Sequence, residues 1–300
     1  MKKSGIVRSG GGNMARLVSV VVCTSLLVAI GSANAQGLVP GCTLPFATIA
    51  KHHPVDDNCD ARGEADQDPQ EHNRDAHALQ NVAKNNFCAT TEGNPALVTF
   101  ISFRKLQQKL DQKAPKAKTW WRENLPKDRT VFRDIYTTSE DATIGEGSVV
   151  TFAAWLMKVK PGSPESCNCG NKNDKAPDTM DLHLVLIPSF PTVQCKTGAQ
   201  TPLECKSVTV EISPHFRPDQ WDEATICNAA RLHPLRFTGQ LMYDAAHRPC
   251  SGSPPKAGQG APARVSSWEI HPVYAIDVCT KKSLSSCKAD NGSVWVPLDH

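Results

Sequence analysis

The feature that most constrains the fold of this 300-residue chain is a change of hydrophobic period near residue 130. From there on, apolar and polar residues alternate in five segments, as they do in strands with one buried face. These segments are 147–159, 181–187, 207–213, 235–243 and 266–278. A helix-compatible stretch at 219–232 separates the third segment from the fourth. Three strands, one helix and two strands in this order are typical of an OB-fold barrel.

We therefore predict a mainly β protein with α-helices, in which residues 131–300 form a five-stranded OB-like barrel. An open sandwich of the same strands is the alternative. Gly147 and Gly239 fall inside strand segments, where a small barrel needs glycine or a bulge to bend. Pro272 cannot donate to a strand ladder, so it predicts an edge or bulged position in the fifth strand.

The preceding region, residues 36–130, is predicted to be irregular and helical. A first helix is expected at about 70–90 and a second at about 96–112, because apolar residues recur there at steps of three and four. The expected buried stripe of the first helix is Ala76, Leu79, Val82, Ala83 and Phe87.

Residues 1–35 have the pattern of a secretory signal peptide. Four cations precede an apolar run from Leu17 to Ile30, and the small-x-small site Ala33-Asn34-Ala35 follows it. The apolar run is about 14 residues, short of the roughly 20 that span a bilayer, so an uncleaved anchor is the less favoured alternative. We predict an exported protein, periplasmic or extracellular, with no transmembrane segment in the mature chain.

Cleavage after residue 35 changes the charge and the cysteine count. It removes four of the 33 cations and none of the 30 acids, so the mature balance is 29 against 30. It also removes Cys23 and leaves 11 of the 12 cysteines in an oxidising compartment, where disulfides persist. The odd number implies a free thiol or an intermolecular bond. The candidate disulfide cysteines are Cys42 and Cys59 in the irregular leader, Cys195 with Cys205, and Cys279 with Cys287.

Seven segments from about residue 80 onward form a recognisable combination. They are NNFC (85–88), GEGSVV (145–150), ESCNC (165–169), DLH (181–183), EISPHFRP (211–218), FTGQLMYDAAHRPC (237–250) and SSWEIHPVYAIDVC (266–279). Together they resemble a set of bacterial exported proteins with an OB-like β-barrel. The resemblance implies the fold and carries no particular activity.

The polar side of the predicted strands holds the candidate site. Asp181 and His183 share one side of the second strand, Glu211 lies on the third, and Glu269 and His271 share one side of the fifth. In an OB-fold order the second and fifth strands flank the third, so these side chains can converge. Imidazole and carboxylate groups together can bind Zn²⁺ or a harder divalent ion.

Two interpretations of this polar side remain open. Charged strand faces are usually solvent-exposed, so ordinary cross-strand pairs on a wet outer surface are preferred over a ligand site. His247 can join the site from the turn after the fourth strand, or it can organise that turn together with Asp244.

Two functions from different classes follow. The first is an exported, disulfide-braced binding or interaction protein whose partner is an unknown ligand or envelope component. The alternative is a metal-assisted hydrolase or nuclease that uses the histidine and carboxylate residues. Single-stranded nucleic acid is a disfavoured ligand, because the mature chain is nearly neutral and only 6% of the residues are aromatic. No cofactor is certain, and a divalent metal such as Zn²⁺ is the candidate.

Overall fold

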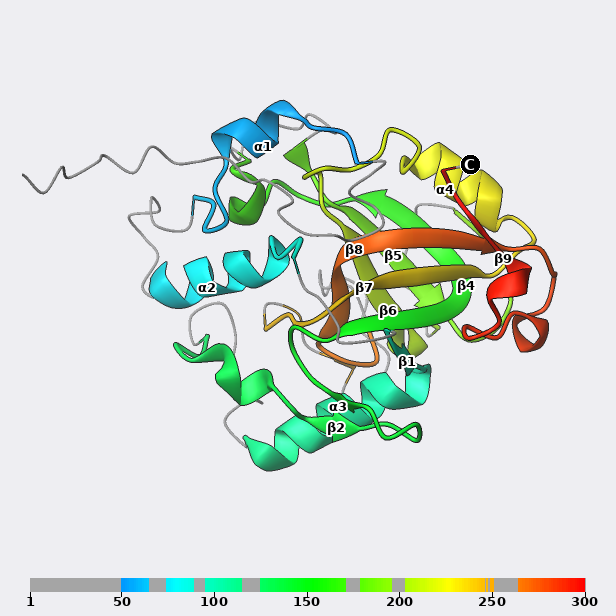
Figure 1. The fold of residues 1–300 in the computed structure, drawn as a ribbon, viewed down its shortest axis with the longest axis horizontal. Helices are drawn as coiled ribbons and strands as arrows, with labels where there is room; N and C mark the ends of the chain where they lie inside the picture. Colours follow the sequence, from blue (N-terminus) through cyan, green and yellow to red (C-terminus); the bar gives the residue numbers. More distant parts are fainter. Residues whose placement is uncertain are drawn as a thin grey trace, which may run out of the picture. The chain divides into compact units, whose positions relative to one another are not determined.

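A computed structural model describes residues 50–64, 74–88, 95–114, 125–170, 179–195, 203–245, 247, 249–250 and 264–299 (Figure 1). The predicted signal peptide and Cys42 lie outside the described residues. The helices and 3-10 turns are α1 (Pro54–Asn58), α2 (Arg74–Lys84), α3 (Phe100–Lys113), η4 (Arg129–Phe132), η5 (Ser166–Asn168), η7 (Glu204–Lys206), α4 (Glu223–Ala230), η8 (Leu284–Ser286) and η9 (Gly292–Val294). The strands are β1 (Ala96–Val98), β2 (Tyr136–Thr137), β3 (Thr143–Ile144), β4 (Val149–Pro161), β5 (Leu182–Ile187), β6 (Val208–Ile212), β7 (Leu235–Tyr243), β8 (Trp268–Cys279) and β9 (Trp295–Pro297).

Five strands close into a barrel, in the order β4-β5-β6-β8-β7 with β7 returning to β4. The β6–β8 pair is parallel, and the other barrel pairs are antiparallel. Helix α4 lies between β6 and β7 in the chain, as expected. The predicted OB-like barrel is therefore confirmed, and the closing β4–β7 pair excludes the open sandwich.

The barrel bends where β7 meets β8. The pairing register shifts on both sides of Gly239, and a Cβ atom added there would lie 2.5 Å from the Pro272 carbonyl oxygen. Glycine is thus required by close backbone approach, and Pro272 occupies a bulged position as predicted. Gly147 lies just before β4 instead of within it, at a φ of +90° that favours glycine.

The N-terminal helices differ from expectation at their starts and faces. Residues 96–98 form the short strand β1 beside β4, and α3 begins only at Phe100. The cause is Thr99, whose side chain accepts a hydrogen bond from the Ser102 amide and caps the helix. The expected apolar stripe of α2 is also wrong in part: Val82 is exposed, whereas Lys84 is buried.

The barrel interior is apolar and is filled by the alternate side chains of all five strands. Leu184, Val210, Phe237 and Ile270 are each fully buried in this core. In Figure 1, α1 and α2 lie on the left of the strands and α4 lies at the upper right. Among the described residues, no helix combines the length and apolar character needed to cross a membrane.

Candidate metal centre on the covered side of the barrel

The polar sides of three adjacent strands bring the predicted residues together. In the β5–β6 pairing, His183 lies directly opposite Glu211, and β8 borders β6 on its other edge. Glu211 therefore lies between the Asp181–His183 pair and the Glu269–His271 pair. The OB-like strand order allows this convergence, and strand curvature and side-chain reach bring it about here.

These side chains are buried, although they point away from the barrel interior. The exposed fractions are 0% for Asp181, Glu269 and His271, 1% for Glu211 and 7% for His183. The preferred expectation of a solvent-exposed outer face is therefore wrong. Strand alternation shows which residues share a side, but another part of the chain decides whether that side is covered.

The end of α2 and the residues after it provide this cover. Lys84, the last residue of α2, extends its ammonium group into the polar side and is buried there. Asn85 Nδ2 donates to the Cys167 carbonyl oxygen at 2.7 Å, and the Tyr274 hydroxyl on β8 donates to the Asn86 carbonyl oxygen. The N-terminal region is thus part of the site.

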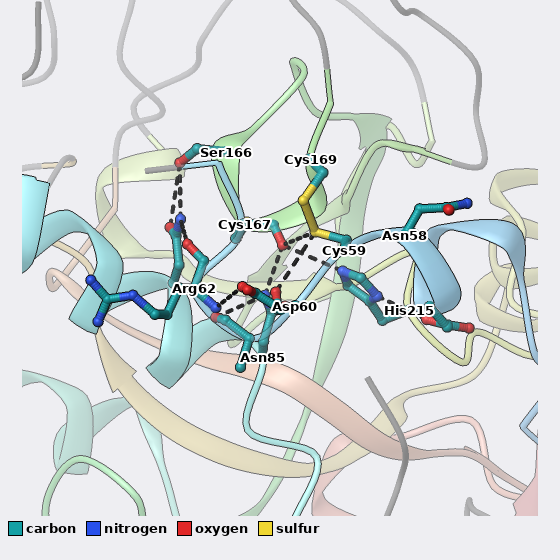
Figure 2. Close-up of a disulfide and its surroundings, with 12 residues drawn as sticks. Asn58, Cys59, Asp60, Arg62, Asn85, Ser166, Cys167, Cys169 and His215 are labelled. Carbon is teal, nitrogen blue, oxygen red and sulfur yellow. Dashed lines mark hydrogen bonds and ion pairs between the residues drawn. A yellow bond between two sulfur atoms is a disulfide. The ribbon is translucent and has the colours of Figure 1, made fainter. Parts of the chain in front are cut away.

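A disulfide joins the cover to the barrel. Figure 2 shows the bond between Cys59, just after α1, and Cys169 in the connection between β4 and β5. Asn85 and His215 approach the Cys167 carbonyl oxygen from two directions, and His215 Nε2 lies 3.3 Å from it. The segment that carries Glu165 is therefore held to the N-terminal region by covalent and polar contacts.

We define the charged cluster as the buried or half-buried groups linked by ion pairs on this side. It comprises Lys84, Glu165, His183, Glu211, Asp244, Arg264, Glu269 and His271, together with Asp181, which interacts electrostatically with His271 and lies in the same group as His183 and Glu211. Glu211 is its central carboxylate. Glu211 Oε2 lies 3.0 Å from His271 Nδ1 and 3.7 Å from Lys84 Nζ. Glu211 Oε1 lies 3.5 Å from His183 Nδ1 and 4.0 Å from Arg264 Nη2.

Glu165 and Asp181 border His183. Glu165 Oε2 pairs with Lys84 Nζ at 2.5 Å, and its Oε1 lies 3.7 Å from His183 Nε2. Asp181 Oδ1 accepts from Asn168 Nδ2 at 3.1 Å. The Glu165 side chain is 21% exposed, so the cluster comes nearest to solvent at this residue.

Arg264 and Asp244 form the other end of the cluster. Arg264 Nη1 donates to Glu269 Oε2 at 2.7 Å and lies 3.5 Å from Asp244 Oδ2. His247 Nδ1 pairs with the same Asp244 oxygen. The expectation that His247 and Asp244 organise the turn is confirmed, and Asp244 also connects that turn to the cluster.

Mutual contacts shift the pKa values of the cluster in opposite directions. Burial disfavours charge on Glu211, but His183, Lys84 and His271 lower its pKa well below the usual range. Burial likewise disfavours imidazolium at His271, yet the hydrogen bond with Glu211 and the nearby Glu269 carboxylate raise its pKa to about 10. Glu211 also raises the pKa of His183 against the effect of burial. Burial raises the pKa values of Asp181 and Glu269.

The cluster contains two groups of side chains that can hold a metal ion, and Glu211 belongs to both. One group is Glu165, Asp181, His183 and Glu211, and the other is Glu211, Glu269 and His271. Within each group the ligand atoms lie within 4.8 Å of one another. This spacing is compatible, after small adjustments, with an ion whose bonds are about 2.0–2.2 Å. The two histidines thus fall in separate groups connected by Glu211.

Five carboxylate-oxygen and imidazole-nitrogen atoms of these residues are buried without a hydrogen-bond partner in the part of the chain that the structure describes. They are Asp181 Oδ2, His183 Nε2, Glu211 Oε1, Glu269 Oε1 and His271 Nε2. Buried polar atoms normally find partners, because an unmet one costs about 1–3 kcal/mol. A cation is the ligand that satisfies several oxygen and imidazole lone pairs at one point. The residues therefore fit a divalent ion.

Sequence reasoning missed four members of the cluster, namely Lys84, Glu165, Arg264 and Asp244, the last of which was expected only to organise a turn. Lys84 ends a helix whose apolar periodicity pointed to a different buried face, and Arg264 lies outside the strand segments. For Glu165 there was one indication in the sequence, because this residue opens the ESCNC segment. Sequence reasoning also missed Gly162, where an added Cβ atom would lie 2.7 Å from His183 Nε2.

The predicted disulfides are corrected in part. Cys279 pairs with Cys287 as expected. Cys195 and Cys205 do not pair with each other: Cys195 bonds Cys227 of α4, and Cys205 bonds Cys250. The reason is tertiary: each of these bonds joins segments that the barrel brings together from 32 and 45 residues away.

Cys59 also has a partner that sequence proximity did not indicate. It bonds Cys169 and therefore not Cys42. Cys88 and Cys167 are free thiols among the described residues, the first exposed and the second buried.

Comparisons of the chain with family models, curated proteins and solved structures find no match.

Proposed function

We propose that this chain is an exported, disulfide-braced barrel protein that binds a divalent metal ion through Glu165, Asp181, His183 and Glu211. The main supporting observation is the set of buried carboxylate and imidazole atoms that have no hydrogen-bond partner among the described residues, three of which belong to this group. Hydrogen bonds within the chain leave these atoms unsatisfied. One bound cation would satisfy them together.

The charge of the cluster supports the same proposal. It holds five carboxylates against two permanent cations, Lys84 and Arg264, and in metal-free protein the His271 imidazolium adds a further positive charge because its pKa is raised to about 10. Buried charge must be neutralised, because an uncompensated ion inside a protein costs several kcal/mol. Without a metal, protons on the imidazoles and on the carboxyls with raised pKa values perform this role. A divalent ion would replace two of those protons.

The donor set indicates which ions to test. Imidazole nitrogen suits Zn²⁺, whereas a majority of carboxylate oxygens suits Mn²⁺ and other harder ions. Zn²⁺ is our first candidate and Mn²⁺ the second.

Four disulfides support an oxidising compartment, in keeping with the predicted signal peptide. An envelope component as a further partner stays a prediction.

Metal titration of purified, chelator-treated protein tests the proposal. We expect one ion per chain by calorimetry and by elemental analysis. His183→Ala should lower the affinity at least about tenfold, since it removes one of four ligands. The matched control is His52→Ala, which alters an exposed histidine. Absence of binding by wild-type protein, or equal affinity in both variants, would contradict the proposal.

A metal-assisted hydrolase is the second candidate. It is favoured by Glu269, a carboxylate that lies beside the proposed ligand group, next to His271, and that can supply a base when ionised. The burial of the cluster argues against bulky substrates. Turnover of a small phosphodiester or ester by metal-loaded protein, lost in Glu269→Gln while metal affinity persists, would establish this activity. No turnover under metal-saturating conditions would leave the binding function alone.

A further inference from the structure

One edge of the Arg264 guanidinium is buried without an acceptor. Arg264 is 0% exposed, and its Nη1 is fixed by Glu269 and Asp244. Its Nε and Nη2 atoms have no hydrogen-bond partner among the residues that the structure describes. In a planar guanidinium these two nitrogens form one edge, with parallel N–H bonds spaced to meet two oxygens of a single oxyanion.

This edge adjoins the proposed metal ligands. Arg264 Nη2 lies 4.0 Å from Glu211 Oε1, an ion-pair separation that is too long for a hydrogen bond. Glu211 Oε1 is itself one of the atoms without a hydrogen-bond partner. Unmet donors and unmet acceptors therefore lie beside each other, and a metal ion with a bound oxyanion would satisfy both.

The chain topology places the edge where OB-type barrels bind ligands. Arg264 belongs to the connection between β7 and β8, and Glu165 belongs to the connection between β4 and β5. In OB-folds the corresponding two loops and the second and third strands form the ligand-binding face. Here the second and third barrel strands carry His183 and Glu211.

We propose that the Nε–Nη2 edge of Arg264 is an oxyanion subsite that binds a small phosphate-like ion next to the metal. This inference rests on the proposed metal-binding function. Three carboxylates, those of Glu211, Asp244 and Glu269, surround the guanidinium and would repel an anion on their own. Binding of the oxyanion therefore requires the divalent ion. Because Arg264 is fully buried, the ligand is a small ion such as phosphate and not a polymer.

The experiment measures inorganic phosphate binding by calorimetry, with and without a saturating divalent ion. Metal-loaded protein should bind one phosphate per chain, and metal-free protein should bind at least about tenfold more weakly. Arg264→Lys keeps the positive charge but lacks the two parallel N–H donors of the guanidinium edge. Phosphate affinity should therefore fall about tenfold or more, while metal affinity changes little. The surface variant Arg231→Lys is the matched control.

A spectroscopic measurement on wild-type protein covers the case in which Arg264→Lys does not fold. Phosphate should shift the Nε–H resonance of Arg264 downfield through a charge-assisted hydrogen bond. The Nε–H groups of Arg129 and Arg236 already donate to Glu146 and Asp277, so their resonances should not move.

Three results would overturn the subsite. They are no phosphate binding by metal-loaded protein at about 10 mM, equal phosphate affinity with and without metal, and unchanged phosphate affinity in folded Arg264→Lys. The last result would mean that phosphate binds the ion alone. If the protein binds no metal, the proposed function fails first, and that result is separate because it comes from the metal titration.

Discussion

Around the charged cluster, the two sides of the barrel strands are both buried but are built from opposite chemistry. On β5, Leu184 points into the barrel and belongs to its apolar core, whereas adjacent His183 points outward into the charged cluster. Both are less than one-tenth exposed. Burial of the inner side follows from closing the barrel. Burial of the outer side depends on α1, α2 and the connection that carries Glu165.

Because of this difference, substitutions on the two sides should destabilise the protein for different physical reasons. An apolar core loses stability in proportion to the volume removed. A charged cluster loses stability when one partner is deleted, because the remaining charges stay buried without compensation. The cluster should also respond to pH, metal and the disulfide that joins its cover to the barrel, and the core should respond to none of these.

The largest effect is expected for Glu211→Gln. This substitution keeps the side-chain size but leaves Lys84, His183 and His271 without their shared carboxylate. We expect the free energy of unfolding to fall by about 3–5 kcal/mol, measured by chemical denaturation of metal-free protein. Glu140→Gln, at an exposed position, is the control. A loss as small as that of the control would show that the cluster contributes little.

Leu184→Ala should destabilise the barrel from its other side. Removing a fully buried leucine side chain costs about 2–5 kcal/mol. We expect the metal affinity of the folded variant to stay unchanged, since the Leu184 side chain lies in the apolar core on the opposite side of β5 from the proposed ligands. Leu232→Ala, at an exposed leucine, is the matched control. A large drop in metal affinity would break the separation between the two sides.

Removal of the Cys59–Cys169 disulfide should weaken the cover selectively. The double variant Cys59→Ser with Cys169→Ser should lose about 2–4 kcal/mol and bind metal less tightly. The Cys279–Cys287 bond is the control, because it closes only 8 residues against 110 and lies away from the charged cluster. Equal losses of metal affinity in the two double variants would contradict a specific role for the cover.

The pH dependence of metal-free protein should come from the cluster. The pKa of His271 is raised to about 10, so its contribution is complete below about pH 6.5 and is lost as the pH rises towards 10. The pKa of Glu211 is lowered, so its contribution is present above about pH 4.5 and is lost in acid. Denaturation at several pH values measures both limbs. His271→Gln should reduce the alkaline limb to the part that His183, whose pKa is also raised, contributes. An unchanged limb would contradict this assignment.

The smallest effect on stability is expected for Gly162→Ala. The added methyl group meets the end of the His183 ring, which can move away. We expect a loss of about 1 kcal/mol or less but a measurable drop in metal affinity, because His183 leaves its position. The test is calorimetric titration of the variant beside Gly292→Ala, whose added methyl group meets nothing within 4 Å. Wild-type affinity would exclude His183 as a ligand.

Much of the fold could be predicted because it depends on local patterns. Strand alternation located all five barrel strands, and the helix after the third strand indicated their order. The same alternation placed Asp181, His183, Glu211, Glu269 and His271 on a common side. These predictions need only the geometry of strands and the connectivity of a small barrel.

The cover of that side could not be predicted, because it depends on contacts between distant segments. Lys84 and Glu165 meet across 81 residues, and Cys59 and Cys169 across 110. The apolar periodicity of α2 pointed to Val82 as buried, yet the helix turns Lys84 towards the cluster. The polar residues of a helix show which face is buried only when the charged residues that pack against that face are known.

An anomalous-scattering experiment on crystals grown with Zn²⁺ tests the central claim most directly. We predict one peak at the zinc absorption edge among Glu165, Asp181, His183 and Glu211, with bonds of about 2.0–2.2 Å. The peak should be absent in crystals of His183→Ala. No peak in wild-type crystals, with ordered water or shifted side chains satisfying Asp181, His183 and Glu211, would contradict the claim.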